Sequence, residues 1–121
     1  DAFATILSEA RKYRLNLTIA HQYIAQLPQE VKATAFGNVG SMAVFRVGAD
    51  DAEFLKNQFD PVFSPQDLLN IDNFNCYVKL LINNQTTRPF NIKIDPPSTA
   101  NPELAPQLKE MSRQKYGIGA N

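Results

Sequence analysis

Arg11 and Gln22 are the residues best placed to do chemistry, and they lie at the two ends of a short apolar stretch. A guanidinium is planar and always charged, and at the edge of a helix the guanidinium of Arg11 could reach across a subunit boundary. Gln22 follows the apolar residues 15–20, and open α/β sheets bind ligands at the carboxyl ends of their strands. Each residue also has a structural interpretation, Arg11 as a solvated helix residue that pairs with a nearby acid and Gln22 as a turn former. From spacing alone the structural interpretations are favoured, because exposed ion pairs imply little.

Other catalytic arrangements lack the residues they need. The chain has one histidine, His21, and one cysteine, Cys76, which are too few for a nucleophilic triad or a tetrahedral zinc site. Its five glycines form neither G-x-x-x-x-G-K-[ST] nor G-x-G-x-x-G. We therefore expect this chain alone to bind neither ATP nor a metal. Cys76 lies in an apolar run and is predicted to be a small buried hydrophobe.

Composition indicates one ordinary globular domain. The chain has 121 residues, of which 44% are hydrophobic and 20% charged. Twelve basic side chains balance twelve acidic ones, so no long-range field points to a polyanion. No apolar run approaches the length of a membrane span, and the single cysteine fits a reducing compartment. These features predict a cytoplasmic protein without a membrane segment.

The elements that would position Arg11 and Gln22 are a helix and a strand. Apolar residues between Phe3 and Tyr13 recur at helical spacing, which places Arg11 at the edge of the apolar stripe, and Asp1 could cap this helix. Residues 15–20 alternate apolar and polar side chains and are predicted to form a strand. A second helix is expected to begin at Pro28 and to stop near Gly37.

The middle of the chain predicts a crossover unit. Residues 41–47 read as a second strand, expected to lie parallel to the first through the intervening helix. Asp50, followed by Glu53, imitates a capping box at the start of the next helix. Ser64 to Asp67 is a further helix start signal.

The last part of the chain predicts a hairpin and a tail. Residues 74–82 and 86–94 flank Asn83, Asn84 and Gln85 as two strands, and Pro89 makes the second strand an edge or bulged strand. After residue 95, a weak amphipathic helix is expected to close at Gly117. Its apolar residues are Leu104, Leu108 and Met111.

Several stretches together resemble the carboxyl-terminal half of the motor domain of HerA/FtsK-type ATPases. The resemblance is strongest to type IV secretion coupling proteins and related conjugative DNA-transfer ATPases. It rests on the order and spacing of SEARKYRLNLTIAHQYIAQL, FGNVGSMAVFRVGADDAEFL, FSPQDLLNIDNF, TTRPF and SRQKYG.

The resemblance implies a partial RecA-like domain of the P-loop NTPase type, with a mainly parallel sheet, a carboxyl-terminal β-hairpin and flanking helices. Residues 1–95 would be the end of that ATPase domain, and residues 96–121 a linker and a carboxyl-terminal helix. In such proteins six subunits form a ring that pumps DNA. Arg11 matches the arginine finger that enters the neighbouring subunit's nucleotide site, and Gln22 matches the sensor of the γ-phosphate or its attacking water. The ATP-binding loop and the Asp-Glu pair that handles magnesium would precede Asp1.

An alternative interpretation is a stand-alone α/β protein-interaction module without catalytic activity. Its docking surfaces would be the edge strand near Pro89 and the terminal helix. In either case we expect self-association, as a ring in the parent protein or by strand exchange in this chain. Neither interpretation assigns a role to His21, Arg46 or Arg88.

Overall fold

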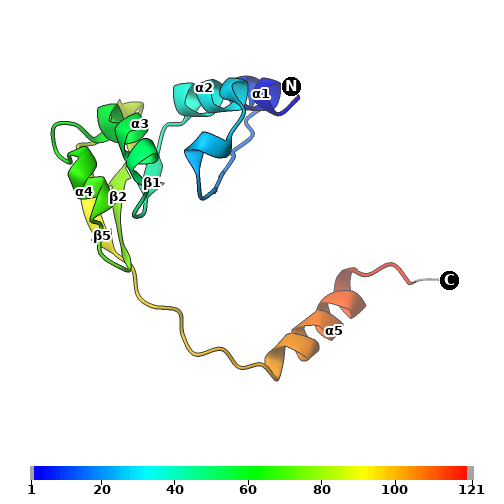
Figure 1. Ribbon diagram of the computed structural model, residues 1–121. Coiled ribbons are helices and arrows are strands. Elements are labelled where there is room, and N and C mark those ends of the chain that lie inside the picture. Colours follow the sequence, from blue (N-terminus) through cyan, green and yellow to red (C-terminus); the bar gives the residue numbers. More distant parts are fainter. Residues whose placement is uncertain (1, 120–121) are drawn as a thin grey trace.

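A computed structural model describes residues 2–119, which form a small α/β body, an extended linker and one separate helix (Figure 1). The expected mixture of helices and strands is confirmed. Asp1, the predicted cap of the first helix, lies outside the described residues. In chain order the elements are α1 (Ala2–Glu9), η1 (Ile24–Gln26), α2 (Gln29–Asn38), β1 (Met42–Val44), α3 (Ala49–Phe59), α4 (Pro65–Leu69), β2 (Asn75–Lys79), β3 (Leu81–Ile82), β4 (Gln85–Thr86), β5 (Phe90–Lys93) and α5 (Leu104–Tyr116).

The main sheet is antiparallel, so the prediction of a mainly parallel sheet is wrong. Its strand order is β1-β2-β5, with Val44 opposite Tyr77 and Cys76 opposite Ile92. Two facts explain the difference. Residues 15–20 form no strand, which leaves β1 with β2 as its neighbour, and β2 is joined to β5 through a hairpin, which makes that pair antiparallel.

Helices α3 and α4 cover one face of this sheet and enclose the core. Phe59 and Leu68 are 0% exposed, and the ring of Phe63 stacks on that of Tyr77 with 3.7 Å between centroids. This aromatic contact joins the loop between the two helices to the central strand. The core cluster consists of Ile24, Val44, Ala52, Leu55, Phe59, Leu68 and Ile71.

Helix starts were predictable where a side chain caps the helix. Before α4, the Ser64 hydroxyl accepts the Asp67 N–H at 3.2 Å, and the Asp67 carboxylate accepts the Ser64 N–H at 2.8 Å, which confirms the start signal. The predicted capping box at Asp50 is wrong, because α3 already begins after Gly48 and Asp50 lies in its first turn. Helix α2 follows Pro28 as expected.

The predicted hairpin is confirmed, with a tighter turn than expected. Asn83 and Asn84 have φ values of 51° and 62°, the left-handed conformation of a two-residue type I′ turn, while Gln85 pairs in β4. Pro89 separates β4 from β5, and β5 is one of the two edge strands of the main sheet. The hairpin is thus divided into an inner pair, β2 and β5, and an outer pair, β3 and β4.

The predicted terminal helix is also confirmed. Helix α5 has 13 residues, ends at Tyr116 with Gly117 as its C-cap, and has no buried residue. Figure 1 shows it well apart from the body, at the end of the extended linker. Within residues 2–119, no helix is long and apolar enough to cross a membrane.

Candidate functional site

Arg11 lies in the turn that ends the first helix. The Leu15 N–H donates to the Ala10 carbonyl at 2.9 Å, and the Arg14 N–H donates to the Arg11 carbonyl at 3.2 Å. Arg14 has a φ of 55°, and a left-handed residue with this pair of bonds is a Schellman motif. The motif fixes the backbone at Arg11 even though the regular helix ends at Glu9.

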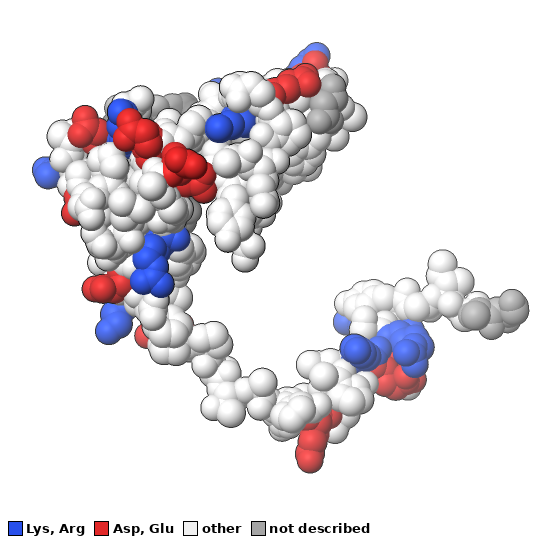
Figure 2. Space-filling model, in the orientation of Figure 1, with Lys and Arg blue, Asp and Glu red and all other residues white. Residues whose placement is uncertain are grey.

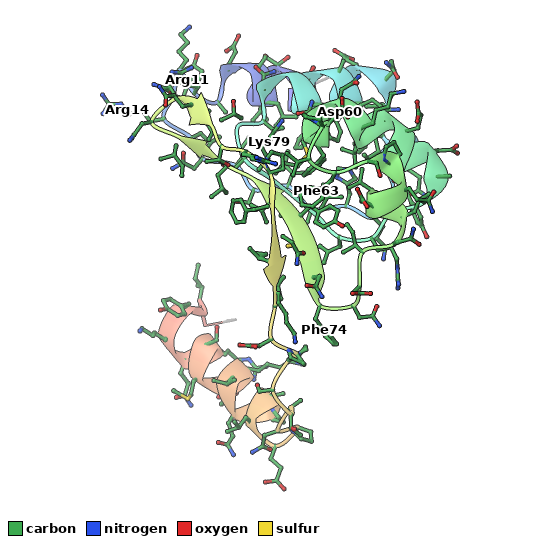
Figure 3. All side chains as sticks on the ribbon, turned by 90° about the vertical axis from the view of Figure 1, so that its left-hand side faces the viewer. Arg11, Arg14, Asp60, Phe63, Phe74 and Lys79 are labelled. Atoms are coloured by element: carbon green, nitrogen blue, oxygen red, sulfur yellow. The ribbon has the colours of Figure 1, made fainter. Side chains whose placement is uncertain are left out.

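The Arg11 side chain is exposed and makes no hydrogen bond or ion pair with any residue that the structure describes. Figure 3 shows Arg11 and Arg14 projecting outward at one edge of the molecule, far from Phe74. The interpretation of Arg11 as half of a local ion pair therefore fails for residues 2–119. Two interpretations of Arg11 remain: its guanidinium is solvated, or it binds a group outside this chain.

The predicted strand at residues 15–20 does not form. Leu15, Leu17 and Ile19 are 49%, 43% and 44% exposed. In the described chain, the N–H and C=O groups of residues 16–22 make no hydrogen bond. A strand needs a partner strand to pair its backbone groups, and nothing in residues 2–119 supplies one. The prediction of a strand is therefore wrong, because the alternation of side chains says nothing about whether a partner strand lies nearby.

Gln22 lies in a bend directly after this segment, and both Gln22 and His21 are exposed. Two residues after Gln22, a buried hydrogen bond attaches the chain to helix α3. The Ile24 N–H donates to the Asp51 carboxylate of α3 at 3.1 Å, and Asp51 is only 6% exposed. The segment from Arg11 to Gln22 is therefore fixed at both ends and free between them.

Arg11 and Gln22 share this segment, but no hydrogen bond joins them in the described chain. A shallow groove beside Arg11 is mostly apolar and has no basic side chain in its wall. It offers nothing with which to hold a phosphate. Its lining residues are Thr5, Ile6, Glu9, Ala10, Tyr13 and Leu15.

The environment of Cys76 does not favour a role as a nucleophile. The thiol is 1% exposed, and burial raises its pKa, which disfavours the reactive thiolate. Cys76 is thus the small buried hydrophobe that the sequence predicted. Residues 2–119 contain no group of three or more His, Cys, Asp or Glu side chains that could hold a metal ion.

Asp51 is the structural residue that sequence reasoning missed, because the capping pattern drew attention to its neighbour Asp50. The only available signal was its position before Ala52 and Leu55, on the buried side of α3. Arg46 donates to the Asn73 side chain at 3.2 Å and so ties two loops together. Arg88 is exposed and has no polar side-chain partner among the described residues.

Charged groups do not gather into a single-sign surface on the body. Figure 2 shows acidic and basic side chains interspersed on the visible face, with basic side chains collected toward the end of α5. Arg113 and Lys115 lie in the last turn of that helix. A scan of the chain against models of known protein families finds no match, and searches of curated proteins and of solved structures find no significant match.

Proposed function

We propose that this chain is the carboxyl-terminal part of a DNA-translocating ATPase of the type IV secretion coupling type. In the parent protein, subunits would form a hexameric ring of RecA-like domains around DNA. Arg11 would act as an arginine finger in the neighbouring subunit's nucleotide site, and Gln22 would sense the γ-phosphate in its own subunit's site. ATP and magnesium would be held by residues outside this chain, which alone hydrolyses nothing.

The observation that carries this proposal is the unpaired segment of residues 15–20. It exposes both backbone polar groups and the apolar side chains of Leu15, Leu17 and Ile19. Strands on either side would satisfy the backbone groups, and helices above and below would bury the side chains. The segment therefore fits a central strand of a larger α/β sheet, with Gln22 at its carboxyl end.

The free guanidinium of Arg11 supports a role in trans. A Schellman motif fixes its backbone, while its side chain points outward without a partner in the described chain. A fixed base and a free planar cation suit a group that completes a site on an adjacent subunit. There it would neutralise charge that develops on the transferred phosphoryl group.

The test is Arg11→Ala in the full-length protein. An arginine finger acts mainly on the transition state, so ATP hydrolysis should fall by about 10³-fold or more while ATP affinity stays nearly unchanged. Lys12→Ala is the matched control, because it removes a neighbouring positive charge, and it should keep near wild-type hydrolysis. Equal loss of binding and hydrolysis in Arg11→Ala would refute the finger role.

The second candidate, a protein-interaction module, is favoured by one observation. The edge strand β5 is exposed along its whole length, and α5 has no buried residue. If the parent protein lacks a phosphate-binding loop and this chain forms a defined complex with another protein, the module is the correct interpretation.

A further inference from the structure

The main sheet has one covered face and one open face. Directly opposed residues of neighbouring strands point to the same side. Ala43 lies opposite Val78, Val78 opposite Phe90, and Cys76 opposite Ile92, so these five residues share a face. We call them the open face, because Val44 and Tyr77, which alternate with them, point to the helices on the other side.

The open face is apolar and incompletely covered. Cys76 and Val78 on the central strand are buried, yet neither belongs to the core cluster beneath α3 and α4. The outer residues Phe90 and Ile92 are 39% and 38% exposed, and Ala43 is exposed as well. Aromatic and aliphatic side chains exposed together in this way indicate a contact surface.

Helix α5 carries a matching apolar stripe. Leu104, Leu108 and Met111 follow one another at i, i+4 and i+7, and so lie along one side of the helix. They are 47%, 61% and 64% exposed. A helix of 13 residues is marginal in water without a packing partner. The same chain thus contains an apolar sheet face whose outer residues are exposed and an apolar helix stripe without a buried residue.

The linker between β5 and α5 bears on whether the helix docks on its own sheet or on the sheet of a second copy of the chain. Residues 95–103 include Pro96, Pro97 and Pro102, which favour an extended chain and restrict the residues before them. A proline-rich stretch of this length spans roughly 28 Å and is semi-rigid. Pro96 and Pro97 follow β5 after only two residues and oppose an immediate reversal over the sheet, and Figure 1 shows the linker leading away from the body.

From these features we infer that α5 docks on the open face of a second copy of this chain. Leu108 is the centre of the contact, with Leu104 and Met111 on either side, and Phe90 and Ile92 form the surface that receives them. When each of two copies docks its α5 on the open face of the other, the same contact forms twice, as a two-fold symmetric dimer requires. The inference does not depend on the proposed ATPase role.

The experiment measures self-association of the 121-residue chain by sedimentation over a range of concentrations. Leu108→Glu should weaken association by at least about tenfold, because it puts a charge in the centre of an apolar contact. Lys109→Gln is the matched control, since it also changes the charge by one unit in the negative direction but lies off the stripe. It should associate like the wild type. Helix α5 makes no buried contact with the body, so Leu108→Glu should leave the core folded.

Mixed copies distinguish exchange from docking within one chain. One copy carries Leu108→Cys, the other carries Ile92→Cys, and both carry Cys76→Val. Under mild oxidation we expect a disulfide between the Leu108→Cys copy and the Ile92→Cys copy. In the control, Lys109→Cys replaces Leu108→Cys, and we expect no disulfide with the Ile92→Cys copy. A wild-type chain that stays monomeric at all concentrations, or equal association of Leu108→Glu and wild type, would overturn the inference.

Discussion

The packed body and the segment from Arg11 to Gln22 differ in how far their apolar and polar groups are satisfied within the described chain. In the body, Ala52, Phe59 and Leu68 are fully buried, and the described chain has no buried side-chain polar atom without a partner. In the segment, every residue is exposed, and residues 16–22 form no hydrogen bond within the described chain. The body thus buries its own core, whereas the segment leaves its backbone polar groups and apolar side chains uncovered. The two residues proposed to do chemistry, Arg11 and Gln22, lie at the ends of the uncovered segment.

The largest expected contrast is between two leucine truncations. Leu68→Ala removes a side chain that is 0% exposed and should lower the free energy of unfolding by about 2–5 kcal/mol. Leu17→Ala lies in the segment, is 43% exposed and should change it by less than about 0.5 kcal/mol. Urea denaturation of the 121-residue chain measures both values. A similar cost for the two variants would mean that the segment is packed.

The next effect concerns the point where the segment meets the body. Asp51→Ala leaves the buried Ile24 N–H without its acceptor and should cost about 1–3 kcal/mol. Asp51→Asn retains an acceptor oxygen and should cost less, and Asp50→Ala, at an exposed position, should cost little. Hydrogen exchange at the Ile24 amide is the local measurement. Unchanged exchange in Asp51→Ala would show that this contact does not hold the segment.

The smallest expected effect is a loss of stability in alkali, located in the body. Burial raises the pKa of the Cys76 thiol. The pKa of the Tyr77 hydroxyl is also raised, first by burial and then by the negative charges of Asp67 and Asp72. A raised pKa in the folded state contributes stability that is fully present below the unfolded pKa and is lost as pH rises through the folded pKa.

Stability should therefore begin to fall as the pH rises past about 8.5, the ordinary pKa of a thiol, and fall further above about 10, the ordinary pKa of a tyrosine hydroxyl. Cys76→Val removes the thiol and should reduce this fall, while the Tyr77 part remains. Urea midpoints at several pH values provide the measurement, and the exposed substitution Lys109→Gln serves as the control. An identical pH dependence in Cys76→Val and wild type would show that Cys76 ionisation is not linked to folding.

Local signals predicted local structure well. Ser64 and Asp67 marked the start of α4, Asn83 and Asn84 marked the hairpin turn, and Leu104, Leu108 and Met111 marked α5. In each case the deciding contacts lie within a few residues, so composition and spacing carry the information.

Sheet arrangement could not be predicted in the same way. The alternation of residues 15–20 predicted a strand that does not form, because pairing depends on which strands are nearby. The burial of Asp51 likewise depends on Ile24, which is distant in the sequence. Gln22 was predicted at the carboxyl end of a strand that does not form within the described residues, and the proposed roles of Arg11 and Gln22 depend on groups beyond this chain.

Subunit mixing tests the proposed division of roles most directly. Full-length subunits carrying Arg11→Ala and full-length subunits carrying Gln22→Ala should each be nearly inactive in ATP hydrolysis. In mixed rings, an Arg11→Ala subunit keeps its own Gln22 and can receive Arg11 from a Gln22→Ala neighbour. At equal mixing about a quarter of the interfaces would be complete. We expect hydrolysis to recover well above the sum of the two separate variants, and no recovery in assembled mixed rings would contradict the proposal.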